Sequence, residues 1–123
     1  MIRKVELVDL CEKIFSGGTP DKTKPEYWDG TIPWLNSGET RNDFILETEG
    51  KITELGVKNS ATQLALKGDI VMASAGQGKT RGQSSFCLID TYVNQSVIVM
   101  RANQEKIDPL YLFYNLKYCY DEL

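Results

Sequence analysis

The chain has 123 residues, of which 41% are hydrophobic and 25% are charged, and this is the size and composition of one globular domain with a buried core. Fourteen basic and 17 acidic side chains give a formal net charge of −3, which excludes a globally basic nucleic-acid binder but not a local basic patch. The sequence contains no histidine, which excludes His-based catalytic triads and most zinc catalysis.

The three cysteines, Cys11, Cys87 and Cys119, lie far apart and form no CxxC pair. This odd number and wide spacing argue against a disulfide framework or a zinc knuckle and predict free thiols in a reducing compartment. Cys87 lies in a strand-like run between Phe86 and Leu88. We therefore expect a buried, inert thiol at Cys87 rather than a nucleophile.

The N-terminal stretch carries acidic residues and lacks the apolar core of a signal peptide. The uncharged run at residues 83–89 is far too short to span a bilayer. We expect a cytoplasmic protein with no membrane partner, no metal and no cofactor.

Short β-favouring runs separated by glycine and proline predict several strands. In chain order, we expect strands at residues 12–15, 32–36, 69–74, 85–89 and 96–101. Pro25 begins a helical turn that reaches Trp28 at most. Thr53 is placed to cap a short helix over residues 54–57.

Asp108 and Pro109 predict the start of a C-terminal helix, as its N-cap and its first helical residue. Leucines recur at helical spacing after them, but aromatic side chains coat the other faces of this helix too. A helix that is apolar all round is buried on more than one side. We expect either a well-packed terminal helix, or an exposed apolar patch and self-association through residues 109–120.

Residues 73–80 match a relaxed phosphate-binding loop that follows a strand-like run. Such a loop must open a helix, whose N-terminus completes the anion site, whereas the residues after Thr80 favour a loop and another strand. We therefore predict that residues 76–82 connect two antiparallel strands, and we keep nucleotide binding as an alternative. Residues 70–89 contain no acidic residue, and their cations suit contact with nucleic acid.

Residues 16–39 combine prolines and glycines with two tryptophans and a tyrosine. A loop of this length is usually functional or disordered, and the aromatic residues argue against disorder. We expect Tyr27, Trp28 and Trp34 to anchor the loop in the core rather than to stack on a ligand.

Polar side chains suited to DNA gather in three segments, around residues 22–24, 36–42 and 77–83. In the major groove, Arg can contact guanine, Asn or Gln can contact adenine, and Glu or Asp can contact cytosine. Residues 36–42 carry all of these groups after a predicted strand, although an ordinary polar turn has the same composition. The candidate DNA-binding residues are Lys22, Lys24, Asn36, Ser37, Thr40, Arg41, Gln77, Lys79, Thr80, Arg81 and Gln83.

Five motifs follow one another along the chain. They are Ser16-Gly-Gly-Thr-Pro, Tyr27-Trp-Asp-Gly-Thr-Ile-Pro-Trp, Ile52-Thr-Glu-x-Gly, Leu66-Lys-Gly-Asp-Ile and Asn94-Gln. Together they resemble a target recognition domain of the DNA specificity (S) subunit of type I restriction-modification enzymes. The resemblance covers nearly the whole chain.

This resemblance implies an α+β fold, with an irregular coiled β-structure of short strands and a C-terminal helix. It also implies a non-catalytic module that reads one half of a split double-stranded DNA target for methyltransferase (M) and restriction (R) subunits. The net charge of −3 then leaves much of the nonspecific phosphate attraction to partner subunits.

The length departs from the family pattern, in which the domain continues beyond the helix that begins near Asp108. We expect residues 1–123 to form a single target recognition domain that is incomplete at its C-terminus. The alternative from another functional class is a truncated interaction module of the same complex that does not read DNA. The DNA-binding interpretation predicts that Lys79 and Arg81 face the same side as Lys22, Lys24 and Arg41.

Overall fold

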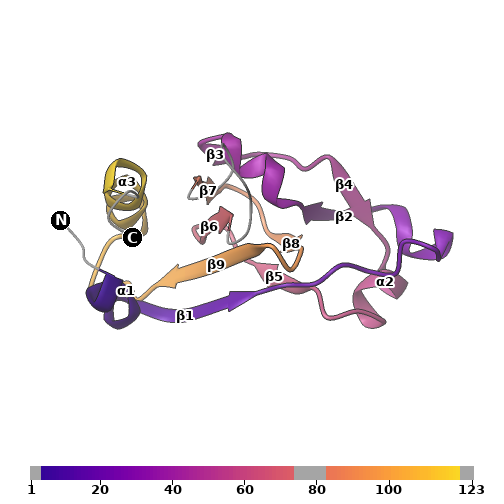
Figure 1. Ribbon diagram of the computed structural model, residues 1–123, viewed down its shortest axis with the longest axis horizontal. Coiled ribbons are helices and arrows are strands. Elements are labelled where there is room, and N and C mark those ends of the chain that lie inside the picture. Colours follow the sequence, from indigo (N-terminus) through magenta and orange to yellow (C-terminus); the bar gives the residue numbers. More distant parts are fainter. Residues whose placement is uncertain (1–3, 74–82, 120–123) are drawn as a thin grey trace.

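The computed structural model describes residues 4–73 and 83–119. In these ranges the molecule is elongated, with helix α3 at one end and helix α2 at the other (Figure 1). In chain order, the elements are α1 (Lys4–Leu10), β1 (Cys11–Ser16), the 3-10 helix η1 (Pro25–Tyr27), β2 (Trp28–Leu35), the 3-10 helix η2 (Ser37–Arg41), β3 (Phe44–Ile45), β4 (Gly50–Ile52), α2 (Glu54–Lys58), β5 (Gln63–Ala65), β6 (Ile70–Ala73), β7 (Ser84–Cys87), β8 (Thr91–Val93), β9 (Val97–Ala102) and α3 (Pro109–Cys119).

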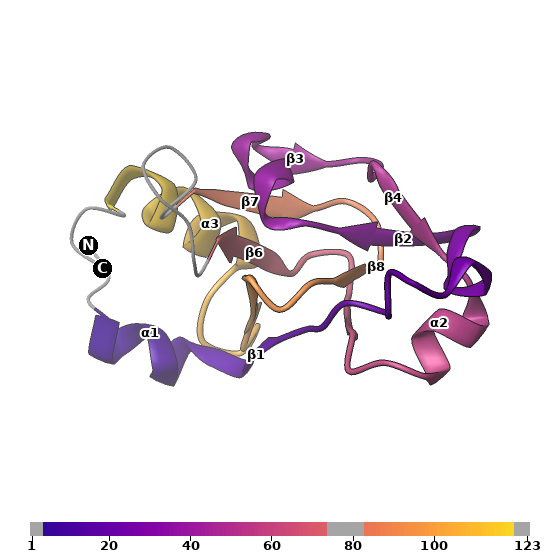
Figure 2. The same cartoon turned by 45° about the vertical axis from the view of Figure 1, so that its right-hand side comes forward.

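The strands form two sheets, which Figure 2 shows from a second direction. One has five strands in the order β1-β9-β6-β7-β3, and the other has four in the order β4-β2-β8-β5. Neighbouring strands are antiparallel except for two parallel pairs, β3 with β7 and β2 with β8. Short strands in mixed sheets together with a C-terminal helix confirm the predicted α+β class.

The central strands of the five-stranded sheet are buried on both faces, because adjacent residues of these strands enter two different hydrophobic clusters. On β6, Ile70 packs in a cluster with Phe113 of α3, whereas Val71 packs with residues of β2 and β8. Phe86 and Cys87 of β7 divide between the clusters in the same way. The sheet therefore forms the middle layer between α3 and the four-stranded sheet.

All five predicted strands are present, as β1, β2, β6, β7 and β9. The second begins at Trp28 instead of Ile32, with a register shift between these residues and a positive φ of 61° at Asp29. Helix α1 and strands β3, β4, β5 and β8 were not predicted. These four strands have two or three residues each, which is too short for an alternating pattern to show.

The capped helices form as predicted. Thr53 Oγ1 accepts a hydrogen bond of 3.1 Å from Gly56 N at the start of α2, and η1 ends at Tyr27. Asp108 Oδ1 accepts a hydrogen bond of 2.9 Å from Leu110 N at the start of α3. Within the described ranges, no helix has the length and apolar character that crossing a membrane would require.

Helix α3 is covered on one side and open on the other. Its fully buried side chains are Leu112, Phe113 and Leu116. By contrast, Leu110, Tyr111 and Tyr114 are 41%, 62% and 45% exposed. Of the two predicted alternatives for this helix, the exposed apolar face is the one present.

The long loop after β1 is anchored by Trp34. This side chain is only 6% exposed, its Nε1 donates to the carbonyl oxygen of Gly18 at 3.1 Å, and its ring packs edge-on against Trp28 at 5.1 Å. Tyr27 and Trp28 are half-buried. The loop also needs glycine at residue 17, because a Cβ there would lie 2.0 Å from the carbonyl oxygen of Val93.

Strands β6 and β7 are antiparallel neighbours, with Ile70 opposite Phe86 and Met72 opposite Ser84. This confirms the antiparallel pair predicted on either side of residues 76–82, which themselves lie outside the described residues. A phosphate-binding loop leads from a strand into a helix. The antiparallel return at Ser84 therefore gives no support to nucleotide binding through residues 73–80.

Trp34 and Trp28 provide a matched test of how the long loop after β1 is anchored. Replacing Trp34 with Phe leaves the buried carbonyl oxygen of Gly18 without its hydrogen bond, which should lower the free energy of unfolding by about 1–3 kcal/mol. The smaller ring also leaves a cavity, which should lower the free energy of unfolding further. Trp28→Phe loses an exposed hydrogen bond to Asp21 O, and should have the smaller effect. Urea denaturation of both variants measures the difference, and equal losses would contradict the assignment of Trp34 as the anchor.

Candidate nucleic-acid interface

The polar cluster after β2 folds into η2 and its caps. Asn36 Oδ1 accepts a backbone N–H two residues later at 2.9 Å, and Glu39 Oε2 accepts from Asn36 N at 3.0 Å, which completes a capping box. Thr40 is fully buried, and its Oγ1 donates to Ser37 O at 2.7 Å. Among the predicted site residues, Asn36 and Thr40 thus hold the turn together.

Ser85 fastens this turn to strand β7. Its hydroxyl donates to the carbonyl oxygen of Thr40 at 3.2 Å and also contacts the carbonyl oxygen of Asn42. Ser85 is itself fully buried. The backbone on both sides of Arg41 is therefore held beside the ends of β6 and β7 that bound residues 74–82.

The turn presents a small set of polar side chains to solvent. Arg41 and Asn42 are exposed and Ser37 is half-buried. Asn42 was not among the predicted contact residues. The Asn36-x-x-Glu39 spacing is typical of a capping box, and this signal could have separated the capping residues from the exposed ones.

Arg41 pairs with an acidic residue from the segment before β4. Its Nη2 lies 3.3 Å from Glu49 Oε1, and the two side chains are 56% and 63% exposed. The other arginine nitrogen, Nη1, donates to Gly38 O at 2.7 Å. Glu39, only 3% exposed, accepts the backbone N–H of Glu49 with its Oε1 at 2.8 Å. One buried carboxylate thus joins the turn to the segment that carries Glu49.

Lys22 and Lys24 are exposed in the loop that leads into η1. Because η1 precedes β2 and η2 follows it, these lysines and Arg41 lie at opposite ends of that strand (Figure 2). Asp21 lies beside the lysines, and hydrogen bonds from Thr23 lower the pKa of its carboxyl group. The carboxylate offsets part of the local positive charge.

Four of the predicted contact residues, namely Gln77, Lys79, Thr80 and Arg81, lie outside the described residues. Gln83 is half-buried, and its carbonyl oxygen accepts from Ala73 N at 3.1 Å to extend the pairing of β6 and β7. Its side-chain oxygen is buried. Gln83 therefore belongs to the base of the strand pair more than to an exposed surface.

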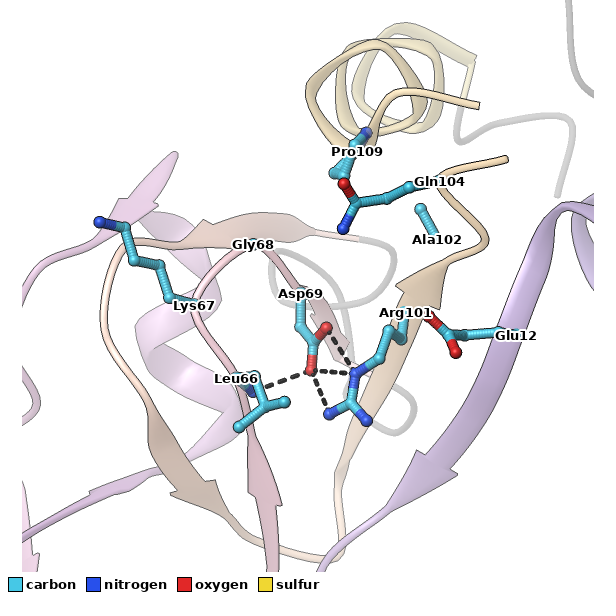
Figure 3. A pocket seen from close by; sticks show the side chains of 9 residues that line it. All are labelled: Glu12, Leu66, Lys67, Gly68, Asp69, Arg101, Ala102, Gln104 and Pro109. Carbon is cyan, nitrogen blue, oxygen red and sulfur yellow. Dashed lines mark hydrogen bonds and ion pairs between the residues drawn. The ribbon is translucent and has the colours of Figure 1, made fainter. Parts of the chain in front are cut away.

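A separate pocket of about 250 Å³ lies between the turn before β6 and the end of β9 (Figure 3). Its lining residues are Glu12, Leu66, Lys67, Gly68, Asp69, Arg101, Ala102, Gln104 and Pro109. Within it, Asp69 Oδ2 lies 2.8 Å from Arg101 Nη2 and accepts from Leu66 N, also at 2.8 Å. The hydrogen bonds from the guanidinium to Asp69 raise the pKa of Arg101.

Within this pocket, Asp69 and Arg101 bind each other and the backbone of the turn. Asp69 closes the turn at Gly68, where φ is +95°, and Arg101 also lies over the ring of Phe15. The Leu66-Lys-Gly-Asp-Ile motif is therefore explained by the fold, without a ligand.

The described cysteines, Cys11 and Cys87, are free. Cys87 is fully buried, which confirms the predicted burial, and desolvation together with the nearby Asp69 and Asp90 raises its pKa to about 12. Burial also raises the pKa of Cys11. At neutral pH, Cys87 holds its proton and is a poor nucleophile.

The family model for the type I restriction modification DNA specificity domain matches residues 2–123. Among curated proteins, the specificity subunit of the type I restriction enzyme EcoR124I/EcoR124II from Escherichia coli is 40% identical over 53 residues. These residues are 42% of this chain and 13% of that protein.

Solved structures share the fold at lower identity. The HsdS subunit from Thermoanaerobacter tengcongensis matches 99% of this chain with a TM-score of 0.69 and 19% identity, and the S subunit from M. genitalium matches 94% with a TM-score of 0.66 and 17% identity. A chain from a structure concerned with assembly and conformational transition of the type I R-M system matches 98% with a TM-score of 0.72 and 18% identity. The present chain spans 26% to 28% of the length of these chains.

The high pKa of Cys87 makes stability depend on pH. Between pH 9, the ordinary thiol pKa, and about 12, the thiol is ionised in the unfolded chain but protonated in the folded one. The unfolded state then binds fewer protons, so the free energy of unfolding falls as pH rises. Over this pH range, the free energy of unfolding of the wild-type chain should fall with a slope that exceeds the slope for a Cys87→Ala variant by about 1.4 kcal/mol per pH unit. Denaturant titrations at each pH measure both free energies, and the same pH dependence in the wild-type chain and the Cys87→Ala variant would contradict the prediction.

Proposed function

Because the chain belongs to the type I restriction modification DNA specificity domain family, we propose that it recognises a specific double-stranded DNA sequence as a target recognition domain. It reads one half of a split target, and it does so as a non-catalytic component on behalf of methyltransferase and restriction subunits. The family match over residues 2–123 is the observation that carries this proposal.

The braced turn η2 supports a recognition role. A rigid backbone presents Ser37, Arg41 and Asn42 to solvent, so little conformational entropy is lost when they contact a base edge. Guanidinium and amide groups are those that read guanine and adenine in the major groove. We assign base contact to these three side chains and a bracing role to Asn36 and Thr40.

Phosphate contact is assigned to the lysines and arginine outside this turn. Lys79 and Arg81 belong to the acid-free segment 70–89, which is bounded by β6 and β7 next to η2. Lys22 and Lys24, at the other end of β2, form a second contact. With a net charge of −3, partner subunits supply the remaining attraction to phosphate.

Lys79→Ala and Arg81→Ala test the phosphate assignment in the complex with the methyltransferase subunits. Each lost phosphate contact should reduce the salt dependence of DNA affinity by about one unit and weaken all sequences alike, whereas an Arg on guanine should cost about 1–3 kcal/mol at one base position. Lys58→Ala removes an exposed lysine of α2 as the control. Unchanged binding in both variants would remove this segment from the interface.

Selection of bound sequences from a random duplex DNA library tests the proposal as a whole. Enrichment of one half-target is expected. A complex that assembles but enriches no sequence would favour the alternative, an interaction module that does not read DNA.

The open face of α3 is the second partner surface that we propose. Leu110, Tyr111 and Tyr114 are exposed there, and Phe44 continues the aromatic surface through its contact with Phe113, with ring centroids 5.7 Å apart. Such a face favours self-association through residues 109–120. Sedimentation equilibrium should show a mass that rises with concentration, and a Tyr111→Ser, Tyr114→Ser double variant should remain monomeric. A monomeric wild-type chain at all concentrations would contradict self-association.

A further inference from the structure

The ion pair between Arg41 and Glu49 is exposed, yet both residues are held in place. Its Nη2 to Oε1 distance is 3.3 Å and more than half of each side chain is exposed to solvent. An exposed ion pair of this kind contributes little to stability. The fold nevertheless fixes the backbone of both partners through buried groups, which stability alone does not explain.

The bracing begins on the Arg41 side. Ser85 binds the carbonyl oxygens of Thr40 and Asn42, which are the residues before and after Arg41. The guanidinium itself keeps one nitrogen on Gly38 O at 2.7 Å. The direction in which Arg41 leaves the turn is therefore set.

The Glu49 side is fixed by the same structure. Glu39 is buried, and its two oxygens accept from Asn36 N at 3.0 Å and from Glu49 N at 2.8 Å. One carboxylate thus sets the spacing between the turn and the segment that carries Glu49. The result is a donor and an acceptor that lie side by side, on main-chain segments whose spacing is set by buried groups.

This spacing matches the edge of one base pair. In the major groove, guanine offers the acceptors N7 and O6 and cytosine offers the donor N4–H. Guanine O6 and cytosine N4 are hydrogen-bonded to each other, so they lie about 2.7–3.2 Å apart. Arg41 Nη2 and Glu49 Oε1 are separated by 3.3 Å with the complementary polarity.

We propose that Arg41 and Glu49 together read one G·C base pair, with Arg41 donating to guanine and Glu49 accepting from cytosine N4. This inference rests on the proposed function. Glu49 is the specificity-determining residue, because its carboxylate repels phosphate and so directs Arg41 to the groove. An A·T pair is rejected, since adenine N6–H would face the guanidinium and thymine O4 would face the carboxylate. A T·A pair repeats the acceptor and the donor as thymine O4 and adenine N6–H, and it differs by presenting the thymine methyl group where guanine presents N7.

Sequence selection by the full chain, assembled with the methyltransferase subunits, tests this with three variants. Arg41→Lys keeps the charge but loses the two-pronged donor, and Glu49→Gln replaces the acceptor by an amide that also donates. Both should lower the preference for G·C at one and the same position, by roughly 5- to 150-fold. Glu47→Gln makes the same charge change at an exposed carboxylate two residues away, and should leave every base preference unchanged.

The outcomes separate this inference from the proposed function. If the wild-type chain enriches no sequence, both are overturned. If it enriches a target and the Arg41 and Glu49 variants keep all its base preferences, or weaken all sequences alike, only the base-pair assignment is overturned. Thermal melting of the variants at the wild-type temperature excludes a loss of fold as the cause.

Discussion

The burial of strand β6 on both faces constrains the rest of the molecule. Ile70 and Val71 are neighbours in the chain but enter different hydrophobic clusters, so a shift of one residue would exchange the two cores. One face requires α3 and the other requires the four-stranded sheet. The same packing positions η2, because it follows β2 of the second sheet and closes against β6 and β7 of the first.

Two buried carboxylates hold irregular segments of the chain in place. Glu39 accepts two backbone N–H groups, and Asp69 accepts one such group together with the guanidinium of Arg101. A buried carboxylate without partners would be costly, so these bonds and the conformations that they need form together. These hydrogen bonds hold the turns of a domain whose strands are mostly short, so the turns do not depend on long helices or strands beside them.

The strands most accessible to prediction were those with enough length for a pattern, such as β6 and β9. Strands of two or three residues are stabilised by partners that are distant in sequence, and no local signal marks them. Composition predicted a polar turn at residues 36–42, but it could not separate Asn36, which caps, from Arg41, which is exposed. That difference depends on which backbone N–H lies near each side chain, and only the fold determines it.

Glu39 and Ser85 hold η2 through the main-chain groups of Asn36, Thr40 and Asn42. Main-chain groups are the same whatever side chain is attached to them. The outward-facing positions of the turn can therefore be exchanged without moving its backbone. Under the proposed function, a lineage would acquire a new DNA preference by point substitutions in this turn, without insertions and without refolding the domain.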